Sequence, residues 1–356
     1  MAIVDGLLLA AKFRGGLLGS LIGDCLGAPY EGDVNISKVV LQQYFNKLGG
    51  SYTANKVPYK PYTDDTAMTK CVASSLIAKG GLDPQDLAKR FVVEYFNDPR
   101  RGYGHNVKDV FSKLRAQKFE DPFGPAREQF DGAGSLGNGA AMRIAPLALF
   151  YHQNYEELVE KAKLSAQITH THKLGVDGTV LQAAAVYQSL QANPKQNLDV
   201  KEFSKGLLQK MAAIEKDEEG LGLDDPHPYQ TQLKIIQDLL AKEDGATDRD
   251  VQKLLGNSVA AQFSVPTAIF CFLRAQESIP DIETENPFQR TIQYAISLGG
   301  DTDTIASVAG AIAGAFYGSS VINDSFIKHC ESSEEIIKLA DELYDASIAR
   351  SAGKGS

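Results

Sequence analysis

The sequence predicts an all-α fold built from many helices. Apolar residues recur at helical spacing in most segments of the chain, several of these segments begin with helix start signals, and strand-like alternation between hairpin turns is nearly absent. A chain of 356 residues with this balance of apolar and charged residues is long enough to bury a large core. The segments with helical spacing are 82–95, 155–168, 176–190, 203–214, 229–240, 266–275, 288–298 and 333–348.

Start signals accompany three of these segments. Asp83-Pro84 opens the first, and Ser333, which two glutamates follow, opens the last. Before segment 266–275, Ser264 and Val265 precede Pro266, which we expect to be the first helical residue because proline is favoured at that position.

The chain shows no internal boundary between domains. No spacer rich in Gly, Ser or Pro divides it, so we expect one domain over 1–349 and a short frayed tail over 350–356. The cysteines are far apart and lack the spacing of zinc or thioredoxin-type motifs. We expect buried free thiols in a reducing compartment at Cys25, Cys71, Cys271 and Cys330.

Charge and hydropathy argue against several classes of protein. The formal net charge is −9, and the 36 basic residues form no run longer than a pair, so duplex nucleic-acid binding is disfavoured. No segment reaches the roughly 20 apolar residues that span a bilayer. Asp5 interrupts the apolar N-terminal patch, which therefore lacks the form of a secretory signal. If such an acidic protein binds an anion, its site needs divalent cations or helix N-termini.

Glycines at four-residue spacing mark two further helices. Each glycine in a helix costs up to about 1 kcal/mol relative to alanine, so a gain from close packing or from function must offset that cost. Such a stripe lets two helix backbones approach closely. One face of the first helix carries Gly15, Gly19, Gly23 and Gly27, and one face of the second carries Gly310, Gly314 and Gly318.

Two clusters of Asp and Thr precede helical patterns. Thr63, Asp64 and Asp65 form the first, and taken alone they fit an ordinary helix N-cap as well as a set of metal ligands. Asp301, Asp303 and Thr304 form the second, directly after a Gly-Gly turn. Oxygen ligands of this kind suit Mg²⁺, Ca²⁺ or Mn²⁺ rather than zinc. The pair of clusters indicates a binuclear centre, because cations would relieve the repulsion among the carboxylates.

A glycine-rich segment, 130–139, precedes the helical pattern 140–150. Such a loop can bring backbone N–H groups and a helix N-terminus to a diphosphate, although a plain turn is the commoner explanation. His170 and His172 flank a helix boundary, where a capping or solvated histidine is usual. We expect the other histidines to be structural or superficial: His105, His152, His227 and His329.

In these features the chain resembles the ADP-ribosylglycohydrolase family, which includes the dinitrogenase reductase-activating glycohydrolases. The resemblance rests on Gly-Ser-Leu-Ile-Gly-Asp-Cys-Leu-Gly-Ala at 19–28 and on the segments 62–68, 134–139 and 299–306, which occur in the family's order. Within the family the chain is most similar to the ADP-ribosylhydrolase 3 subfamily. Glu31 closely follows 27–30, and Ile-Thr-His stands at 168–170, as in that subfamily.

The resemblance implies an orthogonal multi-helix bundle with two Mg²⁺ ions that hydrolyses the bond between ADP-ribose and a hydroxyl, chiefly that of protein serine. Poly(ADP-ribose) and O-acetyl-ADP-ribose would be related substrates. It also implies a monomeric protein of DNA repair, which acts on ADP-ribosylated proteins and binds ADP-ribose in the nucleus, the cytoplasm or the mitochondrial matrix.

The resemblance also implies roles for individual residues. Thr63, Asp64 and Asp65 would hold one ion, and Asp303 would bridge to a second, held by Asp301, Thr304 and Glu31. Glu31 would be the catalytic acid and base, which fits the need to protonate the leaving oxygen in glycoside cleavage. The residues expected to contact the substrate are Phe130, Gly134, Ser135, Leu136, Gly137, Asn138 and His170.

Leu136 departs from the family, because the relatives that the chain most resembles carry an aromatic residue there. The adenine would then stack on Phe130 without a second ring, at a cost on the order of 1 kcal/mol. Three alternatives stay open: a catalytically silent ADP-ribose-binding protein, an arginine-directed ADP-ribosylhydrolase, and a Mg²⁺ phosphohydrolase. Intact ADP-ribose as the product would distinguish a glycohydrolase from a phosphohydrolase.

Overall fold

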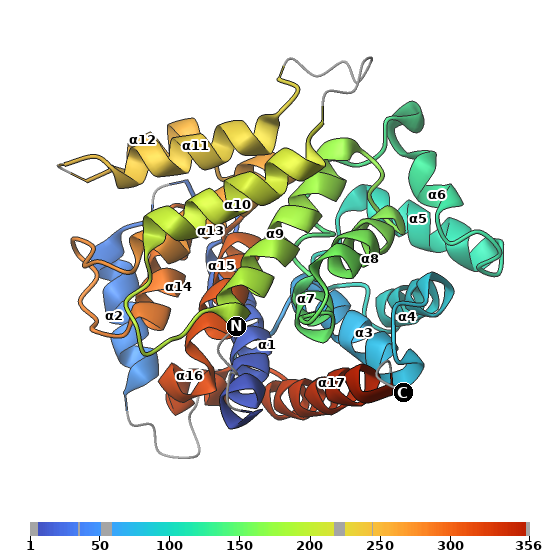
Figure 1. Cartoon of the computed structure of the whole chain (residues 1–356), viewed down its shortest axis with the longest axis horizontal. Helices are drawn as coiled ribbons and strands as arrows, with labels where there is room; N and C mark the ends of the chain where they lie inside the picture. Colours follow the sequence, from blue (N-terminus) through green and yellow to red (C-terminus); the bar gives the residue numbers. More distant parts are fainter. Residues whose placement is uncertain (1–5, 35, 51–58, 217–224, 244, 354–356) are drawn as a thin grey trace.

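Helices α1 (Gly6–Gly27) and α15 (Thr302–Tyr317) pack side by side through the middle of the molecule, and the other helices surround this pair (Figure 1). In the part of the chain that the structure describes there is no β-strand and there are three isolated bridges, which confirms the predicted all-α class. The structure is a computed structural model, and it describes residues 6–34, 36–50, 59–216, 225–243 and 245–353.

Each of the eight segments predicted from apolar spacing contains a helix. Short 3₁₀ turns lie at Ala28–Tyr30, Gln129–Gly132 and Ser319–Val321. The remaining α-helices are α2 (Lys38–Gly49), α3 (Asp64–Lys79), α4 (Pro84–Asn97), α5 (His105–Ala116), α6 (Gly124–Arg127), α7 (Ala145–Phe150), α8 (Tyr155–Gln167), α9 (Lys173–Gln191), α10 (Val200–Ile214), α11 (Pro228–Leu240), α12 (Asp248–Leu254), α13 (Ala261–Arg274), α14 (Pro287–Ser297), α16 (Asp324–His329) and α17 (Ser333–Gly353).

The glycine stripes of α1 and α15 face each other, as their spacing predicts. A Cβ atom on Gly19 would lie 2.0 Å from the carbonyl oxygen of Gly310, and one on Gly23 would lie 2.1 Å from that of Ala306. No side chain fits at such distances, so the two backbones are in direct contact. The hydroxyls of Ser20 and Ser307 hydrogen-bond across the same interface at 2.8 Å.

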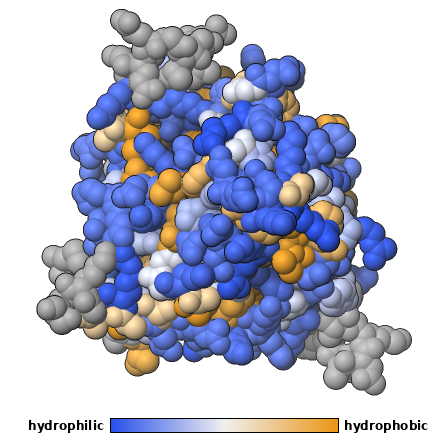
Figure 2. All heavy atoms as spheres, turned by 90° about the vertical axis from the view of Figure 1, so that its right-hand side faces the viewer, coloured by the Kyte–Doolittle hydropathy of each residue, from blue (hydrophilic) through white to orange (hydrophobic). Residues whose placement is uncertain are grey.

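The first helix is both long and apolar. Gly6–Tyr30 is long and apolar enough to cross a membrane by length and composition alone, contrary to the expectation that no segment is. Length and composition alone do not distinguish a membrane span from the central helix of a folded core. In this structure most of the segment is buried against α15 and its neighbours. The face shown in Figure 2 is mainly hydrophilic, with hydrophobic residues in several separate groups.

Two of the three predicted start signals are confirmed. The carboxylate of Asp83 accepts hydrogen bonds from the N–H groups of Gln85 and Asp86 at 3.1 and 3.0 Å and so caps α4. Helix α17 begins at Ser333. The third is wrong, because α13 begins at Ala261 and holds Pro266 in its interior.

Tertiary contacts explain the early start of α13. The N–H of Ala261 donates to the carbonyl oxygen of Leu136 at 3.0 Å, and the N–H of Asn138 donates to that of Val259 at 2.9 Å. These bonds fasten the chain just before α13 to the glycine-rich loop. The helix therefore begins there, although Pro266 lacks an N–H to donate within it.

The helix after the glycine-rich loop is also shorter than predicted. Residues 139–143 form turns, and α7 begins only at Ala145, with Pro146 in its first turn. A helix from 140 to 150 would place this proline in its interior, where it removes a hydrogen bond and clashes with the preceding turn. The expected helix N-terminus directly after the loop is therefore absent.

At the C-terminus, helical structure extends into the predicted frayed tail. Helix α17 continues to Gly353, and the guanidinium of Arg350 pairs with Glu157 of α8. Residues 354–356 of the predicted tail lie outside the described residues. The free thiols are buried, as predicted, at Cys25, Cys71, Cys271 and Cys330.

Because α1 and α15 are in backbone contact, we expect the addition of one methyl group at their interface to lower the stability of the fold strongly. Gly19→Ala would place a Cβ 2.0 Å from a backbone oxygen that only a movement of the helix can relieve. We expect a loss of about 3 kcal/mol or more in the free energy of unfolding, as for overpacked cores, measured by urea denaturation. Gly49→Ala in α2 is the control, because its Cβ would have no neighbour closer than 3.6 Å, and we expect it to be neutral or slightly stabilising. Equal stability of the two variants would contradict the close packing.

Candidate functional site

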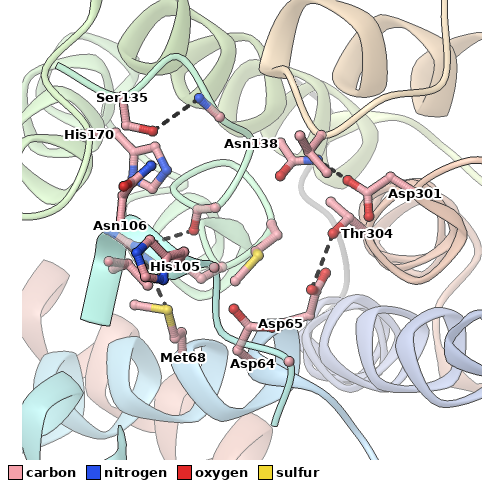
Figure 3. Close-up of a pocket in the computed structure, with 18 of the residues that line it drawn as sticks. Asp64, Asp65, Met68, His105, Asn106, Ser135, Asn138, His170, Asp301 and Thr304 are labelled. Atoms are coloured by element: carbon pink, nitrogen blue, oxygen red, sulfur yellow. Dashed lines mark hydrogen bonds between the residues drawn. The ribbon is translucent and has the colours of Figure 1, made fainter. Parts of the chain in front are cut away.

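One pocket gathers most of the predicted site residues (Figure 3). Its volume of about 510 Å³ lies within the range of small-molecule sites, roughly 300–1,000 Å³. Carboxylates line one part of it, and the glycine-rich loop and the start of α5 line another. The predicted site residues that line it are Glu31, Asp64, Asp65, Phe130, Ser135, Leu136, Gly137, Asn138, His170, Asp301, Asp303 and Thr304.

The first Asp-Thr cluster begins α3. The hydroxyl of Thr63 accepts a hydrogen bond from the N–H of Asp65 at 3.3 Å, so Thr63 is the N-cap that the sequence also allowed. Asp64 and Asp65 occupy the first two helical positions and line the pocket. Thr63 itself does not line it. Capping and metal binding are compatible here, because Thr63 makes the cap while the carboxylates of Asp64 and Asp65 line the cavity.

The second cluster begins α15 after a turn with positive φ at Gly299 and Gly300 (70° and 76°). The N–H of Asp301 donates to the carbonyl oxygen of Asn257 at 2.9 Å, which fastens the start of the cluster. Thr304 then joins the two clusters, because its hydroxyl donates to the Oδ2 atom of Asp65 at 3.2 Å.

Glu31 follows the 3₁₀ turn at the end of α1 and reaches the second cluster. Its loop is fastened to the Gly-Gly turn by two backbone bonds of 2.8 Å, from the N–H of Gly32 to the oxygen of Gly300 and from the N–H of Gly300 to the oxygen of Asp33. Carboxylate oxygens of Glu31, Asp301 and Asp303 lie within 4.8 Å of one another, close enough to share one cation.

The carboxylates of the site raise one another's pKa values. Burial and the charge of Asp303 raise the pKa of Asp65, and the same two causes raise the pKa of Glu31. Burial and the charge of Asp301 raise the pKa of Asp303 to about 7. Crowded carboxylates therefore hold protons in the ion-free protein, and a bound cation would favour their ionised forms instead.

A cation fits this cluster on structural grounds. The Oδ1 atom of Asp65 is buried and has no hydrogen-bond partner within the described residues, which is costly for a carboxylate oxygen. A divalent ion would supply that partner. The donors in reach are the oxygen atoms of Asp and Glu side chains, which Mg²⁺ and Ca²⁺ prefer. The number and identity of the ions stay predictions.

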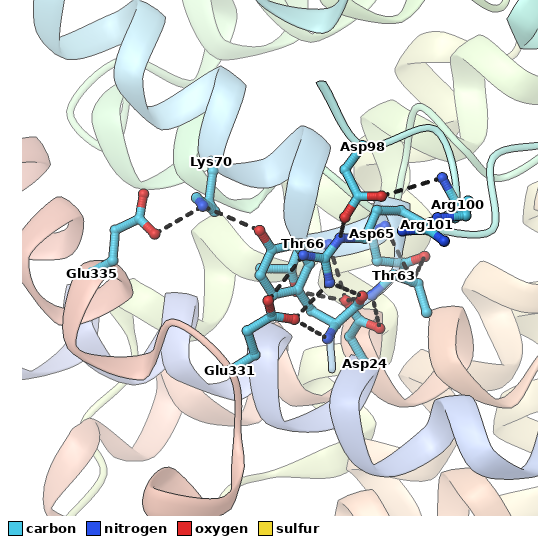
Figure 4. A network of polar contacts seen from close by, with 11 residues as sticks. Asp24, Thr63, Asp65, Thr66, Lys70, Asp98, Arg100, Arg101, Glu331 and Glu335 are labelled. Atoms are coloured by element: carbon cyan, nitrogen blue, oxygen red, sulfur yellow. Dashed lines mark hydrogen bonds and ion pairs between the residues drawn. The ribbon is translucent and has the colours of Figure 1, made fainter. Parts of the chain in front are cut away.

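Asp24 of α1 is a positioning residue that sequence reasoning missed (Figure 4). Its buried carboxylate accepts from the N–H of Thr63 at 3.0 Å, from the N–H of Thr66 at 3.0 Å and from the hydroxyl of Thr66 at 2.6 Å. Burial and the charge of Asp303 raise the pKa of Asp24 to about 7. The available signal was a carboxylate on a glycine-striped helix, where only a partnered charge can be buried.

The other side of the first cluster is held by an ion pair (Figure 4). The guanidinium of Arg101 binds both carboxylate oxygens of Glu331 at 2.6 and 2.9 Å and donates to the carbonyl oxygen of Tyr62 at 3.0 Å. The carbonyl oxygen of Arg101 in turn accepts from the N–H of Asp64 at 2.6 Å. The bidentate pair thus joins the segment before α17 to the start of α3.

The glycine-rich loop is connected to the acidic clusters. The side-chain amide of Asn138 donates to Asp301 at 2.5 Å and to Ser264 at 3.1 Å, which orients it toward the second cluster. The hydroxyl of Ser135 accepts from the N–H of Gly137 at 3.3 Å at the pocket wall. Gly134, expected to contact the substrate, does not line the pocket. A Cβ on it would lie 2.2 Å from the hydroxyl of Thr171, so this glycine serves packing.

The two central histidines have different roles. His170 is buried and lines the pocket, and burial together with the nearby charge of Arg143 lowers its pKa to about 3. It is therefore neutral. His172 caps α9, because its Nδ1 atom accepts from the N–H of Leu174 at 3.1 Å.

The pocket also contains residues that the sequence did not single out. His105, expected to be structural or superficial, lines it together with Asn106 and Val107 of the first turn of α5. The available signal was the Gly-Tyr-Gly segment that precedes this helix. The other additional lining residues are Met68, Gly102, Gly104, Gln129, Gly139, Met142, Arg143 and Val259.

Known proteins are similar to this chain over nearly its whole length. A model of the ADP-ribosylglycohydrolase family matches residues 6–353. The chain is 44% identical over 344 residues to ADP-ribosylhydrolase ARH3 of Bos taurus, covering 94% of this chain and 92% of that one. It is 43% identical to ADP-ribosylhydrolase ARH3 of Homo sapiens, covering 94% and 93% of the two chains.

The fold also matches a solved structure. A structure described as an ADP-ribosylglycohydrolase-related protein complex matches with a TM-score of 0.63 and 22% identity, covering 96% of this chain and 99% of that one. At this identity the likeness concerns the fold alone. The expected family and the expected all-α fold are both confirmed.

Because the carboxylates are crowded, we expect the removal of one of them to change the melting temperature in opposite directions with and without a bound cation. The pKa of Asp303 is about 7 in the folded protein, against an ordinary value of 3.8. The folded protein therefore binds this proton more tightly than the unfolded chain does, and the free energy of unfolding falls as the pH rises from about 4 to 7. We expect Asp303→Asn to raise the melting temperature in EDTA relative to wild type at pH 7, with a smaller difference at pH 4.

Magnesium ions should reverse that order, because Asp303→Asn removes a ligand and loses the stabilisation by bound ions. Asp238→Asn, on the exposed face of α11, is the control and should melt like wild type in both conditions. A lower melting temperature of Asp303→Asn in EDTA at pH 7 would contradict the repulsion.

Proposed function

The chain belongs to the ADP-ribosylglycohydrolase family, and we propose that it hydrolyses the O-glycosidic bond between ADP-ribose and protein serine in a Mg²⁺-dependent reaction. One observation carries this proposal. The carboxylate of Glu31 lies with those of Asp301 and Asp303 at one end of a pocket whose other parts suit a diphosphate and an adenine. The name of the ARH3 relatives, ADP-ribosylhydrolase, supports the reaction class.

Cleavage of a glycosidic bond needs a proton for the leaving oxygen and a stabilised sugar cation. We propose Glu31 for the first task. Burial and the charge of Asp303 raise its pKa in the ion-free protein, whereas a bound cation would favour its ionised form, so proton donation requires Glu31 to move off the ion when the ligand binds. In the second half of the reaction its carboxylate accepts a proton from the attacking water. The acidic cluster beside it supplies negative charge near the developing positive charge of the ribose.

The residues that would hold cations surround this carboxylate. When bound, Mg²⁺ would orient the ribose hydroxyls and acidify a water molecule. We propose two ions, one held by the first Asp-Thr cluster and one by the second cluster with Glu31. Asp24 and Asn138 would act on these ligands indirectly, because they hydrogen-bond the start of α3 and Asp301.

The rest of the pocket suits the ADP moiety. Backbone N–H groups of Ser135 and Leu136 and of the first turn of α5 are the donors available to a diphosphate, since those of Gly137 and Asn138 already bind Ser135 and Val259. Phe130 and Leu136 both line the pocket and remain 54% and 42% exposed, so their apolar surfaces are free to cover an adenine. The donors in this part of the pocket are uncharged, and the acidic clusters lie in another part of it.

Related substrates follow from the same chemistry. Poly(ADP-ribose) and O-acetyl-ADP-ribose also join an ADP-ribose to an oxygen, and we propose that both are hydrolysed. ADP-ribosylated proteins would be the macromolecular partners. We further propose that the protein acts as a monomer in DNA repair, in the nucleus and cytoplasm or in the mitochondrial matrix.

Glu31→Gln tests the proposed reaction. We expect it to lower hydrolysis of serine-ADP-ribosylated peptide at least about a hundredfold, the usual contribution of a general acid, because the amide cannot donate and recover the proton. Mass spectrometry of released ADP-ribose is the measurement, with and without EDTA. Asp33→Asn is the matched control, since Asp33 lies on the same loop and contributes its backbone oxygen rather than its side chain to the turn.

Each alternative has its own outcome in this experiment. Release from arginine-ADP-ribosylated peptide alone would replace serine by arginine as the acceptor. AMP or phosphate as the product would indicate a phosphohydrolase. Binding of ADP-ribose without turnover by wild-type protein in Mg²⁺ would indicate a catalytically silent binding protein, and full activity in EDTA would contradict the role of the metal.

Leu136→Phe tests the position of the adenine. A second ring opposite Phe130 should tighten binding of ADP-ribose about fivefold, which corresponds to about 1 kcal/mol for an aromatic pair. Isothermal titration calorimetry measures this, and Phe130→Ala should weaken binding to a similar or greater extent. An unchanged dissociation constant in both variants would place the adenine elsewhere in the pocket.

A further inference from the structure

Arg143 is a buried cation beneath the pocket. It is fully buried, and no carboxylate lies within ion-pair distance of it among the described residues. Its guanidinium donates instead to the carbonyl oxygens of Gly139 and Ser165 at 3.0 and 3.1 Å and to the hydroxyl of Thr169 at 2.8 Å. A guanidinium has donors only, so the oxygen of Thr169 must accept in the last of these bonds.

The hydrogen bond from Arg143 to Thr169 also determines which nitrogen of His170 carries a proton. The Oγ1 atom of Thr169 lies 2.7 Å from the Nδ1 atom of His170. With one lone pair of the hydroxyl taken by Arg143, its hydrogen still needs an acceptor. Thr169 is fully buried, and the Nδ1 atom is the acceptor that its surroundings offer within the described residues. The hydroxyl therefore donates to Nδ1, which carries no proton.

The other ring nitrogen of His170 faces the glycine-rich loop. Cβ atoms built on Gly137 and Gly139 would lie 3.4 and 3.2 Å from its Nε2 atom, so this edge of the ring lies against two residues without side chains. Figure 3 shows the ring at the same cavity as Ser135 and Asn138. Within the described residues Nε2 has no hydrogen-bond partner in the protein.

We propose that Arg143 and Thr169 are positioning residues that hold His170 in its Nε2–H tautomer, so that an uncharged donor faces an oxygen atom of the bound ligand. The identity of that ligand as ADP-ribose rests on the proposed function, whereas the tautomer does not. Burial and the charge of Arg143 lower the pKa of His170 to about 3, which agrees with a neutral ring.

The tautomer decides what the ring can bind. With Nε2 protonated, the ring donates to a phosphate or hydroxyl oxygen. With Nδ1 protonated, it would direct a lone pair at that oxygen, which would repel a phosphate oxygen and could bind only a hydroxyl that donates. Because Thr169 is itself constrained by a group that cannot accept, the arrangement selects one tautomer before any ligand arrives, and no reorganisation is needed on binding.

Nitrogen-15 NMR of the ring nitrogens tests the tautomer in the ligand-free protein, with the His170 signals assigned by their loss in His170→Gln. In wild type we expect Nδ1 to resonate as an unprotonated nitrogen and Nε2 as a protonated one. Thr169→Val should remove this pattern or mix the tautomers, and Thr169→Ser, which keeps the hydroxyl, should restore it. A protonated Nδ1 in wild type, or the wild-type pattern in Thr169→Val, would overturn the proposal.

Binding of ADP-ribose by calorimetry gives the second readout. We expect Thr169→Val to raise the dissociation constant about fivefold, the effect of one misdirected hydrogen bond, and Thr169→Ser to bind like wild type. Thr291→Val is the control, because Thr291 is an equally buried threonine of α14 whose hydroxyl binds the backbone oxygen of Pro287 at 2.8 Å.

The two readouts separate the inference from the proposed function. If Thr169→Val binds no more weakly than Thr291→Val, the positioning role is wrong. If wild-type protein shows the expected ring nitrogens but binds no ADP-ribose, the tautomer stands and the proposed ligand is wrong.

Discussion

The site depends on the direct backbone contact between α1 and α15. A Cβ on Gly27 would lie 2.5 Å from the carbonyl oxygen of Thr302, and the hydroxyl of Thr302 donates to the oxygen of Gly27 at 2.9 Å. The C-terminal end of the first helix is thereby aligned with the N-terminal end of the second. Because Asp24 lies near that end of α1, Glu31 follows shortly after it, and Asp303 lies in the first turn of α15, residues more than 270 positions apart meet in one cluster.

Such a cluster opposes folding unless its oxygen atoms are satisfied. The hydrogen bonds to Asp24 from the start of α3, and the one to Asp301 from Asn138, stabilise individual carboxylates. They leave the mutual repulsion that raises the pKa values, and the Oδ1 atom of Asp65 still lacks a partner in the described chain. The fold therefore holds ligands in a costly arrangement, which is typical of sites whose stability is completed by what they bind.

The sequence predicted the features of the fold and the site that depend on residues close together in the chain. Helical spacing, the capping residues Asp83 and Thr63 and the glycine stripes were sufficient because each follows from neighbours within a turn or two. The role of Asp24 and the first residue of α13 were not predicted, because contacts with distant parts of the chain determine both. The carboxylate of Asp24 is satisfied by the start of α3, and the chain before Ala261 is fastened to the glycine-rich loop. His105 was missed because tertiary packing brings the start of α5 to the pocket, and the Gly-Tyr-Gly segment before this helix does not by itself indicate that position.

Charge is divided within the pocket in a way that resolves how an acidic protein can bind an acidic ligand. Among the described lining residues, five carboxylates lie on the side of Glu31 and Asp303, and Arg143 is the one Lys or Arg. An exposed arginine near these carboxylates would pair with them and compete with cations for them. Arg143 is instead enclosed by backbone carbonyls and Thr169. Because its guanidinium binds these groups, the carboxylates stay available to cations, and we propose that Arg143 acts on the ligand by orienting the neutral ring of His170.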